Sequence, residues 1–401
     1  MTEIDRPTYL RLVEPYIGKD LIKVFTGQRR VGKSSLMRLV QKRILELSPK
    51  SNFIIIDLED YQFSNIKTDS DLMKYVKTLQ HKKNNILFID EIQEIEHFEK
   101  AVRSLNATGL FDIYLTGSNA NLLSRELSTL LAGRCIEIEV YALSYTEFLE
   151  FHNRESNTSS LQEYMKFGGL PYLRNLELKD EIVFDYLKNI SQSILYRDIV
   201  NRHHIRNTDL LEKVILYLAD NIGSLVSAKK ISDKLNSHHI KTSPKSILEM
   251  IHHLTEACFL HRVKRFEIKG RKIFESNDKY YFEDLGIRNS LIGIRPNDIN
   301  QWMENVVYHH LKIWGYKVYV GKDREREIDF VAEKDGQTRY YQVAYLLPNK
   351  KVIDREFGNL LKITDQYPKT VISLDSMAIG EIQGIPQQNL LDFLTKSPNP
   401  I

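Results

Sequence analysis

Apolar runs and amphipathic stretches alternate through the first 150 residues of the chain. The strand-like apolar runs cover residues 21–26, 53–58, 86–90, 113–116 and 135–140. After the first run, apolar residues recur with helical spacing at Leu36, Leu39, Val40, Ile44 and Leu47. Such alternation is typical of a parallel sheet covered by crossover helices. We therefore expect residues 1–143 to form an α/β core with five parallel strands.

The pattern changes after this core. Residues 144–207 show helical spacing, which is interrupted by Gly168-Gly169-Leu170-Pro171, and we expect a helical lid there. Residues 208–292 show three short helical patterns and then strand-like stretches at 259–266, 272–275 and 280–282. Three helices followed by a β-ribbon predict a winged helix, whose third helix would begin at the cap residue Ser243 with Leu248 on its buried face.

A fresh pattern begins near residue 297. A helix is expected at 302–314, followed by strands at 317–320, 328–332, 340–346 and 370–374. This order predicts a separate small α/β domain over residues 297–395.

Composition narrows the class of protein only a little. The 401 residues are 42% hydrophobic and 27% charged, as in ordinary globular proteins, and they are enough for several domains. The net charge of +3 means that nucleic-acid binding would depend on local basic patches. Because the N-terminus lacks a signal pattern, no apolar run approaches the ~18 residues of a membrane span, and Cys135 and Cys258 stand far apart, we expect a cytoplasmic protein with no membrane partner.

The octamer GQRRVGKS at residues 27–34 carries the clearest chemistry. It lies between an apolar strand and a helix that starts near Lys33, where backbone N–H groups and the helix N-terminus can wrap a triphosphate. Lys33 would reach the β- and γ-phosphates, and Ser34 would hold Mg²⁺. The nucleotide-binding residues would be Gly27, Gln28, Arg29, Arg30, Val31, Gly32, Lys33, Ser34 and Ser35. The alternative is a glycine turn before a basic helix.

A second acidic motif fits the same enzyme class. The run NILFIDE at residues 85–91 is an apolar strand that ends in two carboxylates. Asp90 would bind Mg²⁺ and Glu91 would polarise the attacking water. Alone, such a pair is more often a solvated strand end or a helix cap. The next strand ends in Thr116-Gly117-Ser118-Asn119, which would place polar side chains near the γ-phosphate unless the segment is an ordinary loop.

With these motifs the chain resembles a prokaryotic branch of the AAA+ ATPases that is related to the signalling NTPases and carries a C-terminal nuclease-like domain. The resemblance runs from about residue 6 to 369 and rests on GQRRVGKS, LFIDEIQ, LTGSNANLL, LAGR, FGGLPYL, LYRDIV and REIDFV. It implies that Asn119 senses the γ-phosphate, that Gly169-Leu170-Pro171 packs on the nucleotide from the lid, and that Arg134 is an arginine finger or lid sensor. The Gly168-Gly169-Leu170-Pro171 motif could instead simply break a helix, and Arg134 could be a surface residue. A finger that acts across an oligomer and a sensor that acts within one chain can use the same arginine, so an oligomer is possible and the oligomeric state stays open.

The predicted ribbon is basic. Residues 261–272 read HRVKRFEIKGRK, and Lys245 lies on the helix before it. Such a surface could grip DNA phosphates with a salt-dependent affinity. Winged helices also serve as spacers or protein-docking units, so this alternative stays open.

The last domain looks like a PD-(D/E)xK nuclease fold, in which two acids and a Glu-x-Lys motif bind Mg²⁺ and activate water. Glu304 and Asp329 fit the two acids, but YYQVAY supplies Gln342 and Ala344 in place of Glu and Lys. We therefore expect a degenerate, vestigial metal site, which a lysine from a neighbouring element, such as Lys317 or Lys322, would have to rescue. The two acids could instead pair with Arg324 or Arg326. The four pairs of adjacent histidines, at 203–204, 238–239, 252–253 and 309–310, are expected on polar helix surfaces.

The leading functional prediction is a Mg²⁺-dependent ATPase that couples its nucleotide state to DNA. One alternative is a nucleotide-dependent switch that binds a protein partner and turns over slowly. A second is an ATP-gated nuclease.

Overall fold

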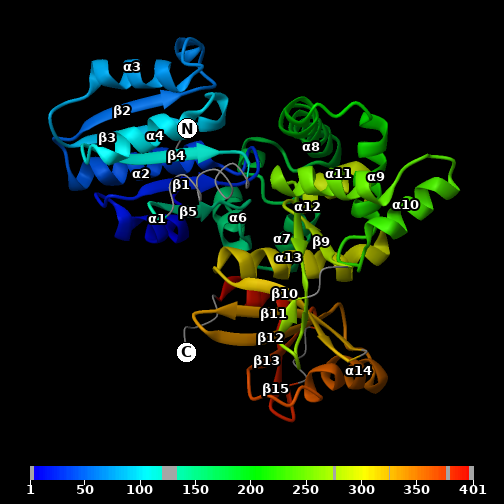
Figure 1. Ribbon diagram of the computed structural model, residues 1–401. Coiled ribbons are helices and arrows are strands. Elements are labelled where there is room, and N and C mark those ends of the chain that lie inside the picture. Colours follow the sequence, from blue (N-terminus) through cyan, green and yellow to red (C-terminus); the bar gives the residue numbers. More distant parts are fainter. Residues whose placement is uncertain (1–3, 120–132, 274–276, 325, 376–379, 397–401) are drawn as a thin grey trace. The chain divides into compact units, whose positions relative to one another are not determined.

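The computed structural model describes residues 4–119, 133–273, 277–324, 326–375 and 380–396. The chain divides into two compact units (Figure 1). The N-terminal unit holds residues 1–141 and 256–258, and the C-terminal unit holds residues 142–255 and 259–401.

A five-stranded parallel sheet forms the centre of the N-terminal unit, as the hydrophobic pattern predicts. Its strands are β1 (Ile22–Thr26), β2 (Asn52–Asp57), β3 (Asn85–Asp90), β4 (Phe111–Gly117) and β5 (Cys135–Glu139). Their order across the sheet is β2-β3-β4-β1-β5, and all neighbours run parallel. Strand β4 therefore lies between β1, which leads into GQRRVGKS, and β3, which ends in Asp90. The carboxyl ends of these three strands meet at one edge of the sheet, where ligands bind in open α/β folds.

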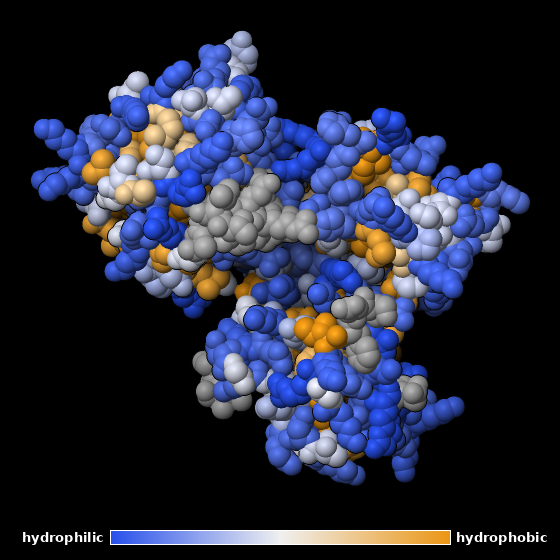
Figure 2. All heavy atoms as spheres, in the orientation of Figure 1, coloured by the Kyte–Doolittle hydropathy of each residue, from blue (hydrophilic) through white to orange (hydrophobic). Residues whose placement is uncertain are grey.

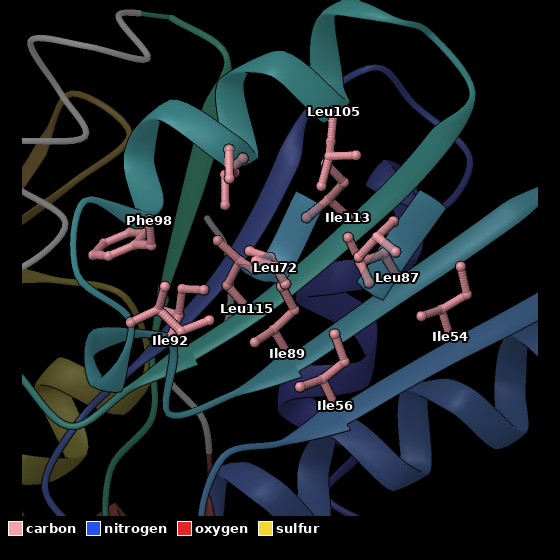
Figure 3. Packing of buried hydrophobic residues seen from close by; sticks show 14 of the residues in the cluster. Ile54, Ile56, Leu72, Leu87, Ile89, Ile92, Phe98, Leu105, Ile113 and Leu115 are labelled. Atoms are coloured by element: carbon pink, nitrogen blue, oxygen red, sulfur yellow. The ribbon is translucent and has the colours of Figure 1, made fainter. Parts of the chain in front are cut away.

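Helices cover this sheet and complete its core. They are α1 (Pro7–Val13), α2 (Lys33–Leu47), α3 (Asp69–Leu79) and α4 (Phe98–Ala107), with short 3-10 turns at Glu14–Tyr16, Tyr61–Phe63 and Ile92–Glu94. Figure 3 shows side chains of β2, β3 and β4 packed with Leu72 of α3 and with Phe98 and Leu105 of α4. On α2 the expected apolar face is buried except for Leu47, the last residue of the helix, which is exposed.

The C-terminal unit begins with helices. They are α6 (Tyr145–His152), α7 (Thr158–Phe167), a 3-10 turn at Pro171–Asn175, α8 (Asp180–Ile194) and a π-helical turn at Leu195–Asn201. The Gly168-Gly169 pair between α7 and Pro171 is tightly anchored. Gly168 has φ +81°, a Cβ there would meet the Asp284 carboxylate at 2.3 Å, and the Gly169 N–H donates to Asp284 Oδ2 at 2.7 Å. Gly168 therefore ends α7 in a backbone conformation and at a close approach that only glycine allows.

Three helices and a two-stranded antiparallel sheet follow. The helices are α9 (Thr208–Asp220), α10 (Ala228–Ser237) and α11 (Pro244–Glu256), and the sheet pairs β6 (Leu260–Val263) with β9 (Lys279–Phe282). Ser243 caps α11 as expected, because its hydroxyl accepts the Ser246 N–H at 3.2 Å. Leu248, however, is 52% exposed, so its expected place on the buried face of α11 is wrong. Met250 lies on the buried face of that helix instead.

The last sheet has eight described strands in the order β14-β15-β13-β12-β11-β10-β7-β8. They are β7 (Arg265–Glu267), β8 (Lys272–Ile273), β10 (Lys317–Asp323), β11 (Arg326–Lys334), β12 (Gln337–Ala344), β13 (Lys369–Ser373), β14 (Glu381–Ile382) and β15 (Ile385–Asn389). The helices of this region are α12 (Leu285–Ile292), α13 (Ile299–Ile313), α14 (Lys350–Leu361) and α15 (Leu390–Thr395), with a 3-10 turn at Pro296–Asp298. Strand β7, from the predicted winged-helix region, pairs in parallel with β10. This sheet therefore includes strands from before residue 297 as well as after it. Among the described helices, none has the length and apolarity needed to cross a lipid bilayer.

Candidate functional site

The loop from Gly27 to Gly32 joins β1 to α2 at the carboxyl edge of the parallel sheet. Gly27 has φ +141°, and a Cβ there would lie 2.1 Å from the Val140 carbonyl oxygen, so only glycine allows this close approach. Arg30 (φ 74°) and Gly32 (φ 98°) are also left-handed. These turns curl the loop back over the N-terminus of α2, which starts at Lys33. A helix N-terminus combined with a curled loop of N–H groups is a binding site for anions.

The Lys33 side chain is buried and lies against the loop. Its Nζ donates to the carbonyl oxygens of Gly27 at 2.9 Å and Gln28 at 3.0 Å. The Glu91 carboxylate is 3.9 Å away. These contacts hold the ammonium at the loop with neutral carbonyl partners, which a phosphate oxygen can replace because a charged acceptor binds an ammonium more strongly.

Asp90 and Ser34, the two expected magnesium ligands, contact each other. Hydroxyls of Ser34 and Thr116 hydrogen-bond the Asp90 carboxylate. Burial nevertheless raises the pKa of Asp90 above its ordinary value, against the effect of these hydrogen bonds. A buried carboxylate beside a serine hydroxyl at this loop is a set of oxygen ligands that suits Mg²⁺. The positive charge of the ion would offset the cost of burying the ionised carboxylate.

Glu91 is held by its backbone at the end of β3. Its backbone is left-handed (φ 55°), and its N–H donates to Thr116 Oγ1 at 2.8 Å. Burial alone would raise the pKa of Glu91, but the charges of Lys33 and Arg29 outweigh burial and lower it. An ionised carboxylate is the form that can polarise a water molecule.

Gln93 contacts this glutamate and was given no role by sequence reasoning. Its Nε2 donates to the Glu91 carboxylate and, at 3.1 Å, to the Ser118 hydroxyl. Gln93 thus joins the end of β3 to the end of β4. The only signal in the sequence is its place two residues after Glu91 in LFIDEIQ, which does not by itself indicate a contact.

Other residues of the predicted loop differ in their surroundings. Arg29 forms an ion pair with Glu59 at 2.5 Å, and the Val31 carbonyl accepts from the buried guanidinium of Arg6 at 3.0 Å. Gln28 is buried, and neither polar atom of its side chain has a hydrogen-bond partner among the described residues. Burying an amide without partners costs free energy, so this side chain marks a place where a bound ligand would be stabilising. Arg30 and Ser35 are exposed.

Asn119 and Arg134 are described, but part of the segment around them is not. Asn119 follows β4 and is buried, and Arg134 precedes β5 and is exposed. Residues 120–123 of LTGSNANLL and residues 131–132 of LAGR lie outside the described residues. Pro171 belongs to the other compact unit, where it begins a 3-10 turn.

The two acids of the predicted nuclease site lie together in the C-terminal unit, with a lysine that sequence reasoning did not identify. Glu304 is on α13 and Asp329 is on β11. The ammonium of Lys279, on β9, is 3.1 Å from Glu304 and 3.5 Å from Asp329. Gln342 lies in the same cavity wall as these two acids. Lys317 and Lys322 are both on β10.

The histidine pair at 309–310 is buried, so the expectation of a polar helix surface is wrong there. His309 Nε2 lies 3.2 Å from the buried Glu283 carboxylate, which also pairs with His261 at 2.5 Å. His310 Nε2 accepts the Tyr145 N–H at 2.9 Å, while its Nδ1 lies 2.8 Å from the Val306 carbonyl. Burial lowers the pKa of His310 to about 3, so this ring is neutral. The pattern of adjacent histidines gave no sign that α13 is covered on several sides.

The predicted DNA-binding surface has two parts. In the ribbon, Arg262 pairs with Asp278 at 2.5 Å and Arg271 pairs with Glu333 at 3.2 Å. On α10, α11 and the turn between them, five lysines are exposed: Lys229, Lys230, Lys234, Lys241 and Lys245. The same stretch holds three acids, Asp233, Glu249 and Glu256. In the view of Figure 2 hydrophilic residues prevail on the face shown.

Two family models and several known proteins are similar to this chain. Residues 19–149 match the family described as AAA domain, and residues 158–298 match a domain of unknown function (DUF8612). The chain is 36% identical over 400 residues to an uncharacterized protein of Haemophilus influenzae, and the aligned region covers 98% of each chain. It is 33% identical to the uncharacterized protein MJ1544 of Methanocaldococcus jannaschii, over 77% of this chain and 71% of that one. Among solved structures, the Walker-type ATPase PABY2304 of Pyrococcus abyssi matches 72% of this chain and 96% of its own, with 17% identity and a TM-score of 0.49.

Proposed function

Because the chain belongs to the family of its Haemophilus influenzae and Methanocaldococcus jannaschii relatives and carries the P-loop AAA domain, we propose that it binds ATP with Mg²⁺ and hydrolyses it. One observation carries the proposal. Lys33, Glu91 and the Ser34–Asp90 pair meet at the carboxyl edge of the parallel sheet, within reach of one phosphate group.

The phosphate loop binds the triphosphate. Backbone N–H groups from Gly27 to Ser35 surround the phosphates, and Lys33 exchanges its carbonyl partners for phosphate oxygens. Ser34 and Asp90 hold Mg²⁺, which neutralises phosphate charge when bound. Gln28 gains the hydrogen-bond partners that its buried amide needs.

Hydrolysis relies on the charged form of Glu91. Its carboxylate orients the attacking water, and Gln93 keeps that carboxylate aligned. Asn119 senses the γ-phosphate from the end of β4, and Arg134 stabilises charge as a finger or a lid sensor. Pro171 contacts the nucleotide from the helical lid of residues 144–207. The rate of hydrolysis is raised mainly by positioning the reactants and by stabilising charge, as in other phosphoryl-transfer enzymes.

The nucleotide state is coupled to DNA through a winged helix over residues 208–292. The exposed lysines of α10 and α11 contact DNA phosphates, and they do so more than the ribbon, because Arg262 and Arg271 are already ion-paired within the protein. A nuclease-like domain over residues 297–395 completes the C-terminal unit.

ATPase rates of the purified chain and of Glu91→Gln test the first part. The variant is expected to bind ATP while hydrolysis falls at least about a hundredfold, since the amide cannot act as a base. Retention of the parental rate by Glu91→Gln would refute the assignment of Glu91. Absence of ATP binding to the unaltered chain, measured by calorimetry with Mg²⁺, would refute the whole proposal.

Salt titrations of DNA binding test the second part. Each lysine that contacts a phosphate contributes about one unit to the slope of log affinity against log salt, so Lys241→Ala and Lys245→Ala should each lower the slope by about one. Lys396→Ala, which removes an exposed lysine of the C-terminal unit that pairs with Asp392, is the matched control.

A switch that binds a protein partner is the second candidate. The internal ion pairs of Arg262 and Arg271 favour it, because they lower the charge that the ribbon can offer to DNA. ATPase rates that do not respond to double-stranded, single-stranded or branched DNA would support the switch.

A further inference from the structure

The ammonium of Lys279 is enclosed by carboxylates. Its Nζ is 2.9 Å from Glu327, 3.1 Å from Glu304 and 3.5 Å from Asp329, and the lysine is 2% exposed. One ammonium therefore contacts three acids and is almost wholly buried among them.

Other donors also bind the oxygens of Glu304 and Asp329. Tyr281 donates at 3.1 Å to the Glu304 oxygen that Lys279 contacts, and Asn300 donates to the second oxygen at 3.2 Å. The second oxygen of Asp329 accepts the Val343 N–H at 2.8 Å. Each of the four oxygens of these two acids thus has a donor, so a metal ion would have to displace existing partners.

Two residues of β12 also depart from the pattern of a metal-binding nuclease site. Gln342 and Ala344 stand where the nuclease pattern has Glu and Lys, so one negative and one positive charge are missing from β12. Lys279 comes from β9, before residue 297, and its Nζ lies within 3.5 Å of both acids. A divalent ion needs several oxygen ligands with net negative charge, and an ammonium among three carboxylates removes part of that charge.

We propose that Lys279 is a built-in cation that takes the place of the metal ion at the Glu304–Asp329 cluster. The cluster then binds the paired strands β6 and β9 to α13 and β11 by charge and holds no catalytic metal. This assignment is independent of the ATPase proposal, because all of its residues lie in the C-terminal unit.

A metal ion can reach the Glu304–Asp329 cluster from a neighbouring cavity. A cavity of about 480 Å³ lies beside the cluster, and its lining includes Asn300, Glu304, Asp329, Gln342 and Glu356. Gln342 is nine-tenths buried and its Oε1 has no hydrogen-bond partner among the described residues, so it is a ready ligand once the ammonium is removed.

The experiment is a Mn²⁺ titration of the full chain, followed by electron paramagnetic resonance. Asp90→Asn is present in every sample to weaken Mn²⁺ binding at the ATPase site. We expect Lys279→Met to bind Mn²⁺ at least about tenfold more tightly than the chain with Lys279, because three carboxylates lose their counter-ion. The added affinity should disappear in Lys279→Met/Asp329→Asn.

A second comparison does not depend on the folding of the lysine variant. With Lys279 present, Asp329→Asn should leave Mn²⁺ binding unchanged, and labelled DNA should remain intact with Mn²⁺ and ATP. Loss of Mn²⁺ binding in that variant would overturn the proposal. So would Lys279-dependent cleavage of DNA, or a folded Lys279→Met protein with no gain in affinity.

Discussion

Lys33 and Lys279 are both buried lysines beside carboxylates, but their partners differ. Lys33 donates to two backbone carbonyls and has its nearest carboxylate, Glu91, at 3.9 Å. Lys279 lies within 3.5 Å of three carboxylates. A lysine with neutral partners keeps the capacity to bind an anion, whereas a lysine surrounded by acids has used that capacity within the fold. The comparison separates a site that is ready for a ligand from a site that is already filled.

The largest effect should come from removing the lysine of the filled site. Lys279→Met leaves buried carboxylates without a counter-ion, so the free energy of unfolding should fall by about 3–5 kcal/mol. Urea unfolding measures this, and Lys279→Met/Glu304→Gln should recover part of the loss. Lys396→Met, which breaks the exposed pair with Asp392, should cost less than about 1 kcal/mol. Equal costs at Lys279 and Lys396 would break the comparison.

Removing the lysine of the open site should affect activity rather than stability. Lys33→Ala should lower the ATPase rate by about 10²–10³-fold, because a charged donor to the phosphates is lost. Steady-state turnover measures the rate, and thermal unfolding without nucleotide should change little. A large fall in the melting temperature would show that Lys33 also serves the fold as Lys279 does.

Acid should distinguish the two units. His310 has a pKa lowered to about 3 in the folded protein and an ordinary value near 6.5 when unfolded. The unfolded chain therefore binds one more proton below pH 6.5, and stability due to this group falls as the pH falls from 6.5 towards 3. Between pH 6.5 and 5 the loss is about 2 kcal/mol relative to His310→Gln.

Hydrogen exchange resolves where this acid effect acts. The amides of α6 and α13 should lose protection with acid in the unaltered chain and less so in His310→Gln, since His310 accepts the Tyr145 N–H. Glu91, whose pKa is lowered, should stay ionised over the same range, so the parallel sheet should respond less. Identical acid responses in His310→Gln and the unaltered chain would contradict this prediction.

The smallest effect concerns Gln93. Gln93→Ala removes the side chain that joins Glu91 to Ser118, and kcat should fall about tenfold with little change in KM, because the water rather than ATP is misaligned. Gln93→Glu serves as the charge control and should be slower still, since like charges would meet. A rise in kcat for Gln93→Ala would mean that Gln93 restrains Glu91.

The sequence is sufficient for the parallel sheet and its ligand edge, because hydrophobic runs and glycine spacing are local properties. The five strands and the start of α2 agree with the pattern to within about two residues. The contacts of Lys279, Gln93 and His310 could not be obtained in this way. Each depends on side chains distant along the chain, or on packing that a pattern of apolar residues does not encode. The exposed Leu248 illustrates the same limit, because helical spacing alone does not say how wide the buried face is.

The pairing of β7 with β10 has a practical consequence for dissecting this chain. A fragment cut at residue 297 would keep β10 but lose the strand that covers its edge, and it would also lose the ammonium of Lys279. An uncovered β-edge recruits other strands, and unneutralised acids weaken the fold around them. Expression trials of the C-terminal piece should therefore begin upstream of β6 at Leu260, and shorter versions are expected to aggregate.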